Sequence, residues 1–532
     1  MRIPKKKELL ELQRKYRTDR KIGEVYGVPA RLVTYWRTKK KISAYSFPKY
    51  TEEKITELWE RFGDDTKAGE ELNISKAGFR QWRRRYSIEY KPIQLRLEQL
   101  EFDLPELNRR KNSRRETIAQ KLLAKKSGLK KVEVGEVVNI EPDMVISRDD
   151  ASAALKYFLQ IGAERVWDPS KIIIALDKQY SSGNGNGYPA PRKTVREFVK
   201  KQKIKSFYDI GQGLCHQLVL ENGLIQPGQL TLGTDSQAMI YGSIGAFGAD
   251  ISAIEMGAIW ATGRIWLQVP KSIKIYLDGH VSRGVFARDI ALKLSRDLAT
   301  DSADYKSLEF YGPVINSMSI SERFALTSLS ESLGCKSIII PFDEITGRYL
   351  RRFGKAKPSP IAADSDADYF REITLDTTYL TPQIGVSGKS DEVVPVEELT
   401  GKRIELVVLG SCGSGRIEDI EAAARIMRGR HVFHDVRMYI VPASRNVFME
   451  ALDKGFVKTL SDSGAIFMNP GCGICMDIHQ RMMEPGERAM TTSHCSHIFD
   501  SDSSNDIYLV SPATAAASAI EGVVADPRKY AK

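Results

Sequence analysis

Short apolar runs alternate with amphipathic helical patterns from about residue 116 to the end of the 532-residue chain. The run at 171–176 (KIIIAL) has the length of a strand and is apolar on both faces, whereas residues 417–427 place apolar side chains at helical spacing. This alternation is typical of α/β layers whose strands are buried by helices on both sides. We therefore predict an α/β body at 116–532, with further strands at 336–341 and 404–409 and glycine-rich turns at 228–235, 242–248 and 410–415.

The positive charge of the chain is concentrated at its N-terminus. The net charge is +11, and residues 1–92 hold 24 of the 79 Lys and Arg but only 13 of the 68 Asp and Glu. The remaining 440 residues are therefore balanced, with 55 basic and 55 acidic side chains. Only the N-terminal segment favours a nucleic-acid partner on grounds of charge.

Two copies of one small helical unit make up this basic segment. Residues 23–42 align with residues 69–88 at a constant offset of 46. Each copy predicts three helices, with a turn before the third helix at Gly27 or Asn73, two residue types that tolerate a left-handed backbone. The apolar residues expected to face inward from the third helices are Val33, Trp36, Phe79 and Trp82.

Each copy resembles a helix-turn-helix unit, and the pair favours DNA binding by residues 1–92. In this interpretation the third helix enters a groove while basic side chains contact phosphates. The alternative is that such small helical units dock on proteins and that the Lys/Arg runs are solvated faces. Residues 93–115 are expected to form a helical linker to the body. The candidate DNA-binding residues are Arg31, Arg37, Lys39, Lys40, Lys41, Arg80, Arg83, Arg84 and Arg85.

The number of cysteines and the hydropathy pattern indicate the cellular compartment in which the protein is expected. Six cysteines are too few for a disulfide-stapled secreted protein of this length. The N-terminus lacks the apolar core of a signal peptide, and no later apolar stretch reaches membrane-spanning length. We therefore expect a cytoplasmic protein with reduced thiols and no membrane-embedded part.

Three of the cysteines form a pattern that suits metal binding. Cys412 lies in the segment GSCGSGR directly after a predicted strand, and Cys472 and Cys475 form a CGIC pair 60 positions later. Small flanking residues let backbone amides approach sulfur, which stabilises a charged cluster. A C-x-x-C pair alone also suits a redox dithiol or one half of a zinc site.

The body resembles the aconitase and 3-isopropylmalate dehydratase (homoaconitase) large-subunit family. GSC-x-x-GR followed by GCG-x-C is the cysteine signature of that family, and matching segments such as 207–236 and 241–270 extend over nearly all of residues 116–525. The resemblance implies a three-domain α/β/α body and a 4Fe-4S cluster held by Cys412, Cys472 and Cys475. It also implies a separate small subunit as partner, because the swivelling domain of full-length aconitases has no counterpart here.

The resemblance further implies candidate site residues. In the family, an open iron acts on the leaving hydroxyl of a small-molecule substrate, His and Asp pairs move protons, and arginines hold carboxylates. Matching positions give Asp177, Lys178, His216, Asp235, Ser236 and His497 as catalytic candidates. They give Gln237 and Arg416 as substrate-binding candidates.

Several of these positions depart from the family pattern. Lys178 and Gln237 stand where the family has histidines. Residues 496–502 (SHIFDSD) replace a family stretch that carries two arginines, so His497 and an acidic loop of Asp500, Asp502 and Asp506 take their place. An acidic loop repels anions, and we therefore expect an altered, less anionic substrate.

Two functions of different classes fit the sequence. The first is a cluster-dependent hydro-lyase or isomerase of a hydroxy acid, working with a small subunit. The second is a DNA-binding regulator in which a catalytically degenerate, cluster-holding body senses iron, redox state or a small-molecule effector. The enzyme interpretation follows the family, whereas the regulator interpretation accounts for the basic N-terminus and the lost arginines.

Overall fold

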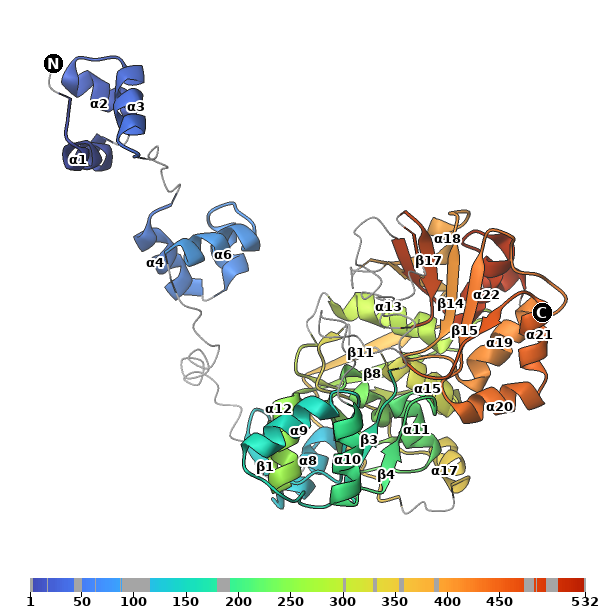
Figure 1. Ribbon diagram of the computed structural model, residues 1–532. Helices are drawn as coiled ribbons and strands as arrows, with labels where there is room; N and C mark the ends of the chain where they lie inside the picture. The colour runs from blue at the N-terminus through green and yellow to red at the C-terminus, as the bar shows by residue number, and fades with distance from the viewer. Residues whose placement is uncertain are drawn as a thin grey trace. The chain divides into compact units, whose positions relative to one another are not determined.

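The structure is a computed structural model of the 532-residue chain, and it divides into two compact units, Met1–Ser113 and Arg114–Lys532 (Figure 1). Most of the predicted linker, together with Cys475, His497, Asp500 and Asp502, lies outside the described residues, and for Ser236 only the backbone is described. The described residues are 3–16, 18–42, 50–62, 64–86, 88, 115–178, 192–299, 303–328, 333–353, 358–386, 392–472, 483–484, 486–493 and 506–530.

The N-terminal unit contains two sets of three helices, as the repeat predicts. Thr18 and Asp64 occupy matching positions, and each caps the second helix of its set by accepting backbone N–H bonds. Gly27 and Asn73 both adopt the left-handed backbone after that helix, with φ of 62° and 52°. The helices are α1 (Lys6–Tyr16), α2 (Asp19–Tyr26) and α3 (Ala30–Lys39) in the first set, and α4 (Glu52–Phe62), α5 (Asp65–Glu70) and α6 (Lys76–Arg85) in the second.

Each set encloses its own small apolar core. Val33 and Trp36 of α3 are buried against Leu9 and Ile22, and Phe79 of α6 is buried in the second core, as predicted. Trp82 is only partly buried at the edge of that core. These short helices owe their stability to this packing, because isolated helices of such length are marginal in water.

In each helix set, one arginine that was predicted to contact phosphate instead forms a buried ion pair within the set. Arg37 is buried, pairs with Asp19 at 2.8 Å and donates to the carbonyl of Ile42. Arg83 repeats this arrangement 46 residues later, pairing with Asp65 at 2.7 Å and donating to the carbonyl of Ile88. A buried guanidinium needs such a carboxylate partner, so these two arginines belong to the fold of each set.

The body begins with a five-stranded parallel sheet of order β4-β3-β2-β5-β6. The apolar run predicted at 171–176 is its strand β3, buried on both faces because Ile172 and Ile174 face one core and Ile173 faces another. Helices α8, α9, α10 and α12 pack on the first face, and α11 with the 3-10 helix η2 packs on the second (Figure 1). The strands are β2 (Met144–Ser147), β3 (Ile172–Ala175), β4 (Ser206–Tyr208), β5 (Leu230–Gly233) and β6 (Phe247–Asp250). The helices are α8 (Ile118–Ser127), α9 (Ala151–Gln160), α10 (Arg192–Gln202), α11 (Cys215–Glu221), η2 (Ser236–Ile244) and α12 (Ala253–Thr262).

A four-stranded parallel sheet of order β10-β9-β8-β11 follows, with helices α13 and α15 in its core. The strand predicted at 336–341 is β10. A two-stranded antiparallel ribbon of β1 and β7 belongs to neither sheet. The strands are β1 (Val137–Ile140), β7 (Ile265–Gln268), β8 (Ser272–Asp278), β9 (Ser307–Tyr311), β10 (Ser337–Ile339) and β11 (Arg371–Asp376). The helices are α13 (Ala287–Ala299), α14 (Pro313–Ser317), α15 (Ile320–Thr327) and α17 (Glu344–Arg351).

The third sheet is seven-stranded, with order β13-β12-β18-β17-β14-β15-β16, and only the two pairings of β12 are antiparallel. Its core packs against α19 and α22, and Figure 1 shows this sheet with α19 to α22 at the C-terminal end of the body. The strands are β12 (Gln383–Val386), β13 (Val393–Pro395), β14 (Leu406–Gly410), β15 (Arg437–Val441), β16 (Ile466–Phe467), β17 (Arg488–Thr491) and β18 (Asp506–Leu509). The helices are α18 (Val396–Leu399), α19 (Ile417–Met427), α20 (Arg445–Asp453), α21 (Phe456–Asp462), α22 (Pro512–Glu521) and the 3-10 helix η4 (Pro527–Lys529).

Three predictions of turns or loops were wrong. The segment 242–248, predicted as a glycine-rich turn, contains the end of η2 and the start of β6. The segment 228–235, predicted as a turn, contains strand β5, because its four residues are buried between β2 and β6 despite the flanking glycines. Asp506, predicted in an acidic loop, begins strand β18. By contrast, residues 411–415 form the predicted loop directly after β14, and residues 417–427 form α19 as predicted.

None of the helices in the described part of the chain is both long and apolar enough to cross a membrane.

Candidate functional site

Polar residues follow the carboxyl ends of three neighbouring parallel strands and lie at one edge of the five-stranded sheet. Arg148 follows β2, Asp177 follows β3 and Asp235 follows β5. The carboxyl ends of adjacent parallel strands meet at one edge, so residues distant in sequence come into contact there. Two of these residues were predicted, whereas Arg148 was not.

Arg148 connects the two predicted carboxylates. Its Nε donates to Oδ1 of Asp177 at 3.0 Å, and its Nη1 donates to Oδ2 of Asp235 at 2.5 Å. The second oxygen of Asp177 accepts the backbone N–H of Cys215, the first residue of α11, at 2.9 Å. Asp177 is thus fixed by partners on two elements and has no freedom to rotate away from the site.

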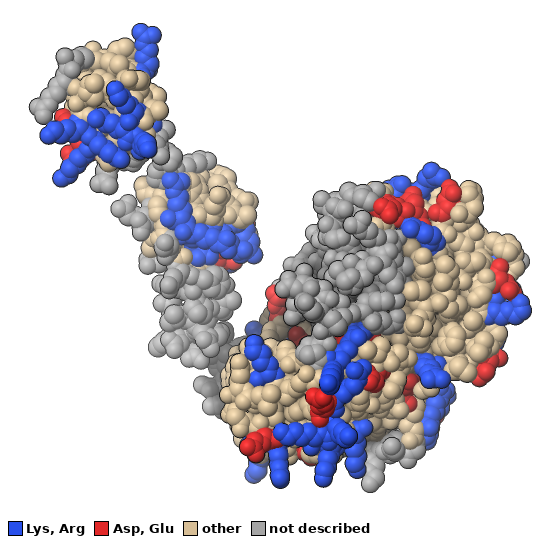
Figure 2. Space-filling view, in the orientation of Figure 1, with Lys and Arg blue, Asp and Glu red and all other residues tan. Residues whose placement is uncertain are grey.

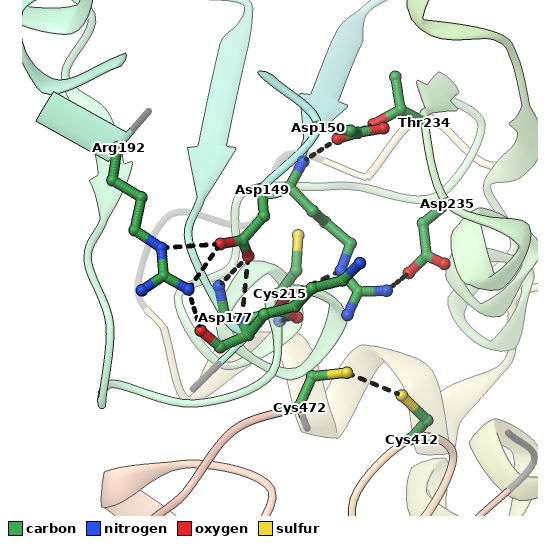
Figure 3. A network of polar contacts seen from close by, with 11 residues as sticks. Asp149, Asp150, Asp177, Arg192, Cys215, Thr234, Asp235, Cys412 and Cys472 are labelled. Atoms are coloured by element: carbon green, nitrogen blue, oxygen red, sulfur yellow. Dashed lines mark hydrogen bonds and ion pairs between the residues drawn. The ribbon is translucent and has the colours of Figure 1, made fainter. Parts of the chain in front are cut away.

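A third carboxylate, that of Asp149, holds the backbone at Asp177 and Lys178 in place. Its Oδ2 accepts the backbone N–H groups of Asp177 and Lys178, and its Oδ1 accepts from Nε of Arg192 at 3.1 Å. Arg192 also donates to the carbonyl of Lys178. Figure 3 shows the guanidinium of Arg192 directed at the carboxylate of Asp149. Asp149 therefore sets the direction in which Asp177 leaves the strand.

The cysteine pair lies against this network. Cys412, in the loop after β14, and Cys472 direct their sulfur atoms toward one another at 3.8 Å (Figure 3), without a disulfide bond. Both are buried, with 1% and 4% of their surface exposed. The backbone N–H of Cys472 donates to the carbonyl of Asp177 at 2.8 Å. The first and third sheets thus meet at the cysteines, and two thiols sit beside a buried carboxylate.

The loop that carries Cys412 is tightly shaped. Gly415 has φ of 78°, and a Cβ there would lie 2.3 Å from the carbonyl oxygen of Val441 on the next strand. Arg288 of α13 donates to the carbonyl of Gly413 at 2.8 Å and to that of Thr492 at 3.0 Å, so it ties the loop to the residue after β17. The loop geometry therefore depends on small residues and on one buried guanidinium.

Asp177 holds a proton more firmly than an ordinary aspartate. Burial, with the nearby negative groups Cys472 and Asp149, raises its pKa from 3.8 to about 7, although Arg148 acts in the opposite direction. A carboxyl group that titrates near neutral pH can both give and take a proton under physiological conditions.

His216 of α11 is buried and neutral. Burial lowers its pKa to about 3, and its ring lies 5.4 Å from the ring of Phe324. Among the described residues, neither of its ring nitrogens has a hydrogen-bond partner. A buried imidazole without partners is costly, so its nitrogens indicate a place where a polar group not present here would bind.

Arg416 also lies over the ring of Phe324, with its guanidinium carbon 4.0 Å from the ring centroid. Its Nε and Nη2 bond to Ser321, and Nη2 also reaches the carbonyl of Gly413 next to Cys412. Arg416 also lines a pocket of about 590 Å³ that contains Gln217 and Phe324 but not the cysteine pair. It therefore braces the cysteine loop and borders a cavity.

The structure brings together most of the predicted site residues that it describes. Asp177, Asp235 and Cys472 are linked by direct bonds to Arg148 or to one another, and Lys178 pairs with Cys472 in a parallel β-bridge. Gln237 is buried in η2, two residues after Asp235. Cys475 and His497 fall outside the description. Sequence reasoning missed Arg148, Asp149 and Arg192, although the first two follow directly after an apolar run, which is the position at which α/β proteins place functional groups.

Within the described residues, no group of three or more His, Cys, Asp or Glu side chains is arranged to hold a metal ion. Cys475, the predicted third sulfur ligand, is not among those residues. The donors that are described nevertheless suit a thiolate-bound group. They are two convergent buried thiols, flanked by a guanidinium and an imidazole that each have buried nitrogen atoms without partners in the described part of the chain.

Comparisons with known proteins agree with these observations. Residues 189–522 match the model of the aconitase family (aconitate hydratase). The 3-isopropylmalate dehydratase large subunit 1 of Methanopyrus kandleri is 37% identical over 416 residues, which cover 78% of this chain and 99% of that protein. A probable methanogen homoaconitase large subunit of Methanosarcina mazei is 37% identical over 388 residues, covering 73% of this chain and 98% of that protein. A solved structure, aconitase X of Thermococcus kodakaraensis in its holo-form, is a looser match, with a TM-score of 0.42, 12% identity, and coverage of 68% of this chain and 85% of that one.

The family match spans more than half of the chain, and the relatives are aligned over almost their entire length. The predicted family and the predicted α/β body are therefore confirmed, and with them the expectation of a hydro-lyase. The chain belongs to the aconitase family of hydro-lyases.

Proposed function

We propose that this chain is the large subunit of a hydro-lyase that removes water from, or adds it across, a small hydroxy acid with the help of a 4Fe-4S cluster. The observation that carries this proposal is the buried pair of Cys412 and Cys472, with sulfurs 3.8 Å apart beside a carboxyl group that titrates near neutral pH. Thiols that can hold a Lewis-acidic cluster, next to a proton-transfer group, suit the removal of water, which needs both an activated hydroxyl and a group that exchanges a proton.

Cys412, Cys472 and Cys475 are the proposed cluster ligands. When bound through three cysteines, such a cluster supplies a Lewis acid that polarises the leaving hydroxyl of the substrate. Small residues around Cys412 and the burial of both described thiols support this assignment, because a charged cluster is stabilised by close backbone amides.

Asp177 is the proposed proton-transfer group. With a pKa near 7, a large fraction of Asp177 carboxyls is charged at neutral pH and able to accept a proton, and the rest can donate one. Arg148 and the backbone N–H of Cys215 hold its two oxygens, so the proton is exchanged from a fixed position. His216, neutral because of burial, would hydrogen-bond to substrate as an uncharged donor or acceptor.

The remaining predicted roles are proposals of the same kind. Lys178 and His497 are candidate acid/base groups, and Asp235 and Ser236 are further catalytic candidates. Gln237 is a candidate substrate contact, and so is Arg416 at the pocket that it lines. Because the stretch at 496–502 lacks arginines, we propose a substrate with fewer carboxylates than a tricarboxylic acid. A separate small subunit is the proposed partner, since the relatives are named large subunits.

The enzymatic proposal is tested by oxygen exchange. Anaerobically reconstituted protein is incubated with a panel of hydroxy acids in ¹⁸O-labelled water, with and without a small subunit of the family. Reversible removal of water places ¹⁸O in the hydroxyl of a true substrate even when net conversion is small. We expect incorporation with at least one mono- or dicarboxylic hydroxy acid. Absence of label from every acid, in the presence of the small subunit, would contradict the proposal.

A second function, DNA binding by residues 1–92, is favoured by one specific observation. The two helix sets repeat the same internal ion pair, yet both leave basic side chains exposed on the third helix, among them Arg31 and Lys39 on α3 and Arg84 and Arg85 on α6. Arg80 is half-exposed and also pairs with Asp65, at 3.1 Å. Figure 2 shows Lys and Arg side chains gathered over these helices. A basic helical face of this kind suits the phosphates of a duplex.

The regulatory form of this proposal couples DNA binding to the cluster. The full chain, reconstituted or freed of iron, is titrated with labelled duplex DNA while its fluorescence anisotropy is followed at several salt concentrations. DNA binding predicts an affinity that falls steeply with salt, and the regulatory form predicts different affinities for the two states. Equal DNA affinity of the reconstituted and the iron-free chain would contradict regulation by the cluster but not DNA binding itself. The absence of any DNA binding would contradict the whole DNA proposal.

A further inference from the structure

We infer that Arg148 is a positioning residue for the cysteine site: its guanidinium supplies the positive charge and the N–H donor that face the group bound by Cys412 and Cys472. In this role Arg148 governs how firmly that group is retained and at what potential it is reduced. The inference rests on the proposed iron-sulfur function and assigns a role to a residue that the family signature at the cysteines does not include.

The guanidinium is oriented from two sides. Asp177 binds Nε at 3.0 Å and Asp235 binds Nη1, so two carboxylates from neighbouring strands fix its plane. The side chain of Arg148 is 11% exposed, which leaves little room for other orientations. A guanidinium is rigid and planar, and fixing two nitrogens therefore fixes the direction of the third.

The third nitrogen, Nη2, has no hydrogen-bond partner among the described residues, although it is buried. Leaving a buried donor of a charged group unpaired is unfavourable, and native structures rarely do so without a reason. An acceptor that is not part of the described protein would satisfy it. The sulfur atoms of a bound cluster, or of the thiolates that hold it, are acceptors of the required charge.

The cysteines lie where this nitrogen can act on them. Cys472 donates its backbone N–H to the carbonyl of Asp177, the same residue whose carboxylate binds Arg148. Asp177, Asp235, Cys472 and Cys412 are also the negative groups that raise the pKa of Arg148 against the effect of its burial. The charges of both cysteines therefore act on the guanidinium of Arg148.

This placement has a physical consequence for a bound cluster. N–H donors and positive charge near the sulfur atoms stabilise the additional negative charge of the reduced cluster and so raise its reduction potential. Asp235 partly neutralises Arg148 and should act in the opposite direction. Removal of Arg148 and removal of Asp235 are therefore expected to shift the potential with opposite signs.

Arg192 provides a matched control. It is also a partly buried arginine in the same network, but it bonds to Asp149 and to the carbonyl of Lys178. Its loss should disturb the fold around β3 as much as the loss of Arg148, without removing the donor that faces the sulfurs. A purely structural role of Arg148 would make the two variants alike.

The experiment uses the full chain, reconstituted anaerobically with iron and sulfide. Reduction potential is measured by spectroelectrochemistry, the reduced state by electron paramagnetic resonance, and iron retention by transfer to a chelator. We expect Arg148→Gln to lower the potential and to lose iron about tenfold faster, in line with the loss of a metal site's supporting hydrogen bond. Arg148→Lys, which keeps the charge, should recover most of the potential, Asp235→Asn should raise it, and Arg192→Gln should leave it unchanged.

Each outcome decides the inference. Opposite shifts for Arg148→Gln and Asp235→Asn support it, and if Arg148→Gln does not fold, Arg148→Lys and Asp235→Asn still test the predicted signs. A wild-type potential and wild-type iron retention in Arg148→Gln, with only a lower unfolding temperature, would overturn the inference while leaving the cluster intact. Failure of the wild-type chain to retain iron would overturn the proposed function and this inference together.

Discussion

Single buried polar groups determine the chemistry of the site, and each depends on partners from other elements. Asp177 is held by Arg148 from β2 and by the first backbone N–H of α11, and its own carbonyl binds Cys472. No local sequence pattern could have revealed this arrangement, because the partners are brought together only by the parallel order of the strands. Residue types at motif positions were predictable, whereas Arg148, which joins them, was not.

Replacement of the carboxyl group of Asp177 tests its proposed role in proton transfer. Asp177→Asn keeps the size of the side chain but removes the group that titrates near pH 7. Loss of a general acid or base typically lowers turnover about 10²- to 10⁴-fold. We expect such a loss in the oxygen-exchange assay, with iron content close to that of the wild type. Unchanged turnover in this variant would assign proton transfer to another residue.

A second buried carboxyl group, Asp289 of α13, makes stability depend on pH. Burial raises its pKa to about 7, although it accepts the backbone N–H groups of Gln383 and Phe286. In the unfolded chain this group loses its proton near pH 4, whereas in the folded chain it keeps the proton up to about pH 7. Its contribution to stability therefore falls as pH rises from about 4 to about 7, by about 1.4 kcal/mol for each unit of pKa difference.

Asp289→Asn removes this dependence because an amide does not titrate. We expect the variant to be less stable than the wild type at pH 5 and to differ from it less at pH 8, as measured by denaturant unfolding of the full chain at both pH values. An equal difference at the two pH values would show that Asp289 is charged throughout.

At the level of elements, prediction succeeded for long periodic segments and for short apolar runs such as β3, and failed for a short strand flanked by glycines. Helix α19 (Ile417–Met427) was predicted at its correct bounds because eleven residues carry the helical period. Strand β5 (Leu230–Gly233) was missed because glycines flank only four buried residues, and its neighbours β2 and β6 determine that it is a strand. Short elements obtain their conformation from tertiary contacts that the local sequence does not contain.

The loop after β14 should not tolerate a side chain at Gly415. In Gly415→Ala the new Cβ would lie 2.3 Å from the carbonyl oxygen of Val441 in a left-handed backbone, so the loop must shift and carry Cys412 with it. We expect iron retention to be lost and the protein to be destabilised by more than ~1 kcal/mol. Gly429→Ala is the matched control, since its φ is also positive but nothing lies within 4 Å of the new Cβ. Equal iron retention in both variants would contradict the proposed dependence on loop shape.

Two adjacent arginines of α6 should behave differently. Arg83 is buried and paired with Asp65, whereas Arg84 is exposed. Arg83→Met should destabilise the second helix set by ~3 kcal/mol, because buried Asp65 loses its buried arginine partner and keeps only the half-exposed Arg80, and should raise amide hydrogen exchange across residues 50–86 of the full chain. Arg84→Met should leave exchange unchanged, weaken DNA binding and reduce the salt dependence by the equivalent of about one phosphate contact. Identical exchange in both variants would mean that the Arg83 pair does not stabilise the fold.

At the scale of the whole molecule, membership of the aconitase family accounts for the fold of the body. The N-terminal unit needs a separate explanation of its function. Relatives are aligned over 98% to 99% of their length, while part of this chain has no counterpart in them. The family, the α/β class and the proximity of Cys412 and Cys472 could be predicted from the sequence, because they depend on motifs. The substrate could not, since the segment 496–502, proposed above to bear on substrate choice, departs from the family pattern.

The central claim is that Cys412 and Cys472 bind an iron-sulfur cluster, and metal analysis tests it most directly. The full chain is reconstituted anaerobically, and iron and acid-labile sulfide are measured per chain in the wild type, Cys412→Ala, Cys472→Ala and Cys335→Ala. Cys335 is the matched control because it is equally buried but lies in the core of the second sheet. We predict equal iron and sulfide in the wild type and Cys335→Ala, and loss of both in the other two variants. Wild-type iron and sulfide content in Cys412→Ala would contradict the account.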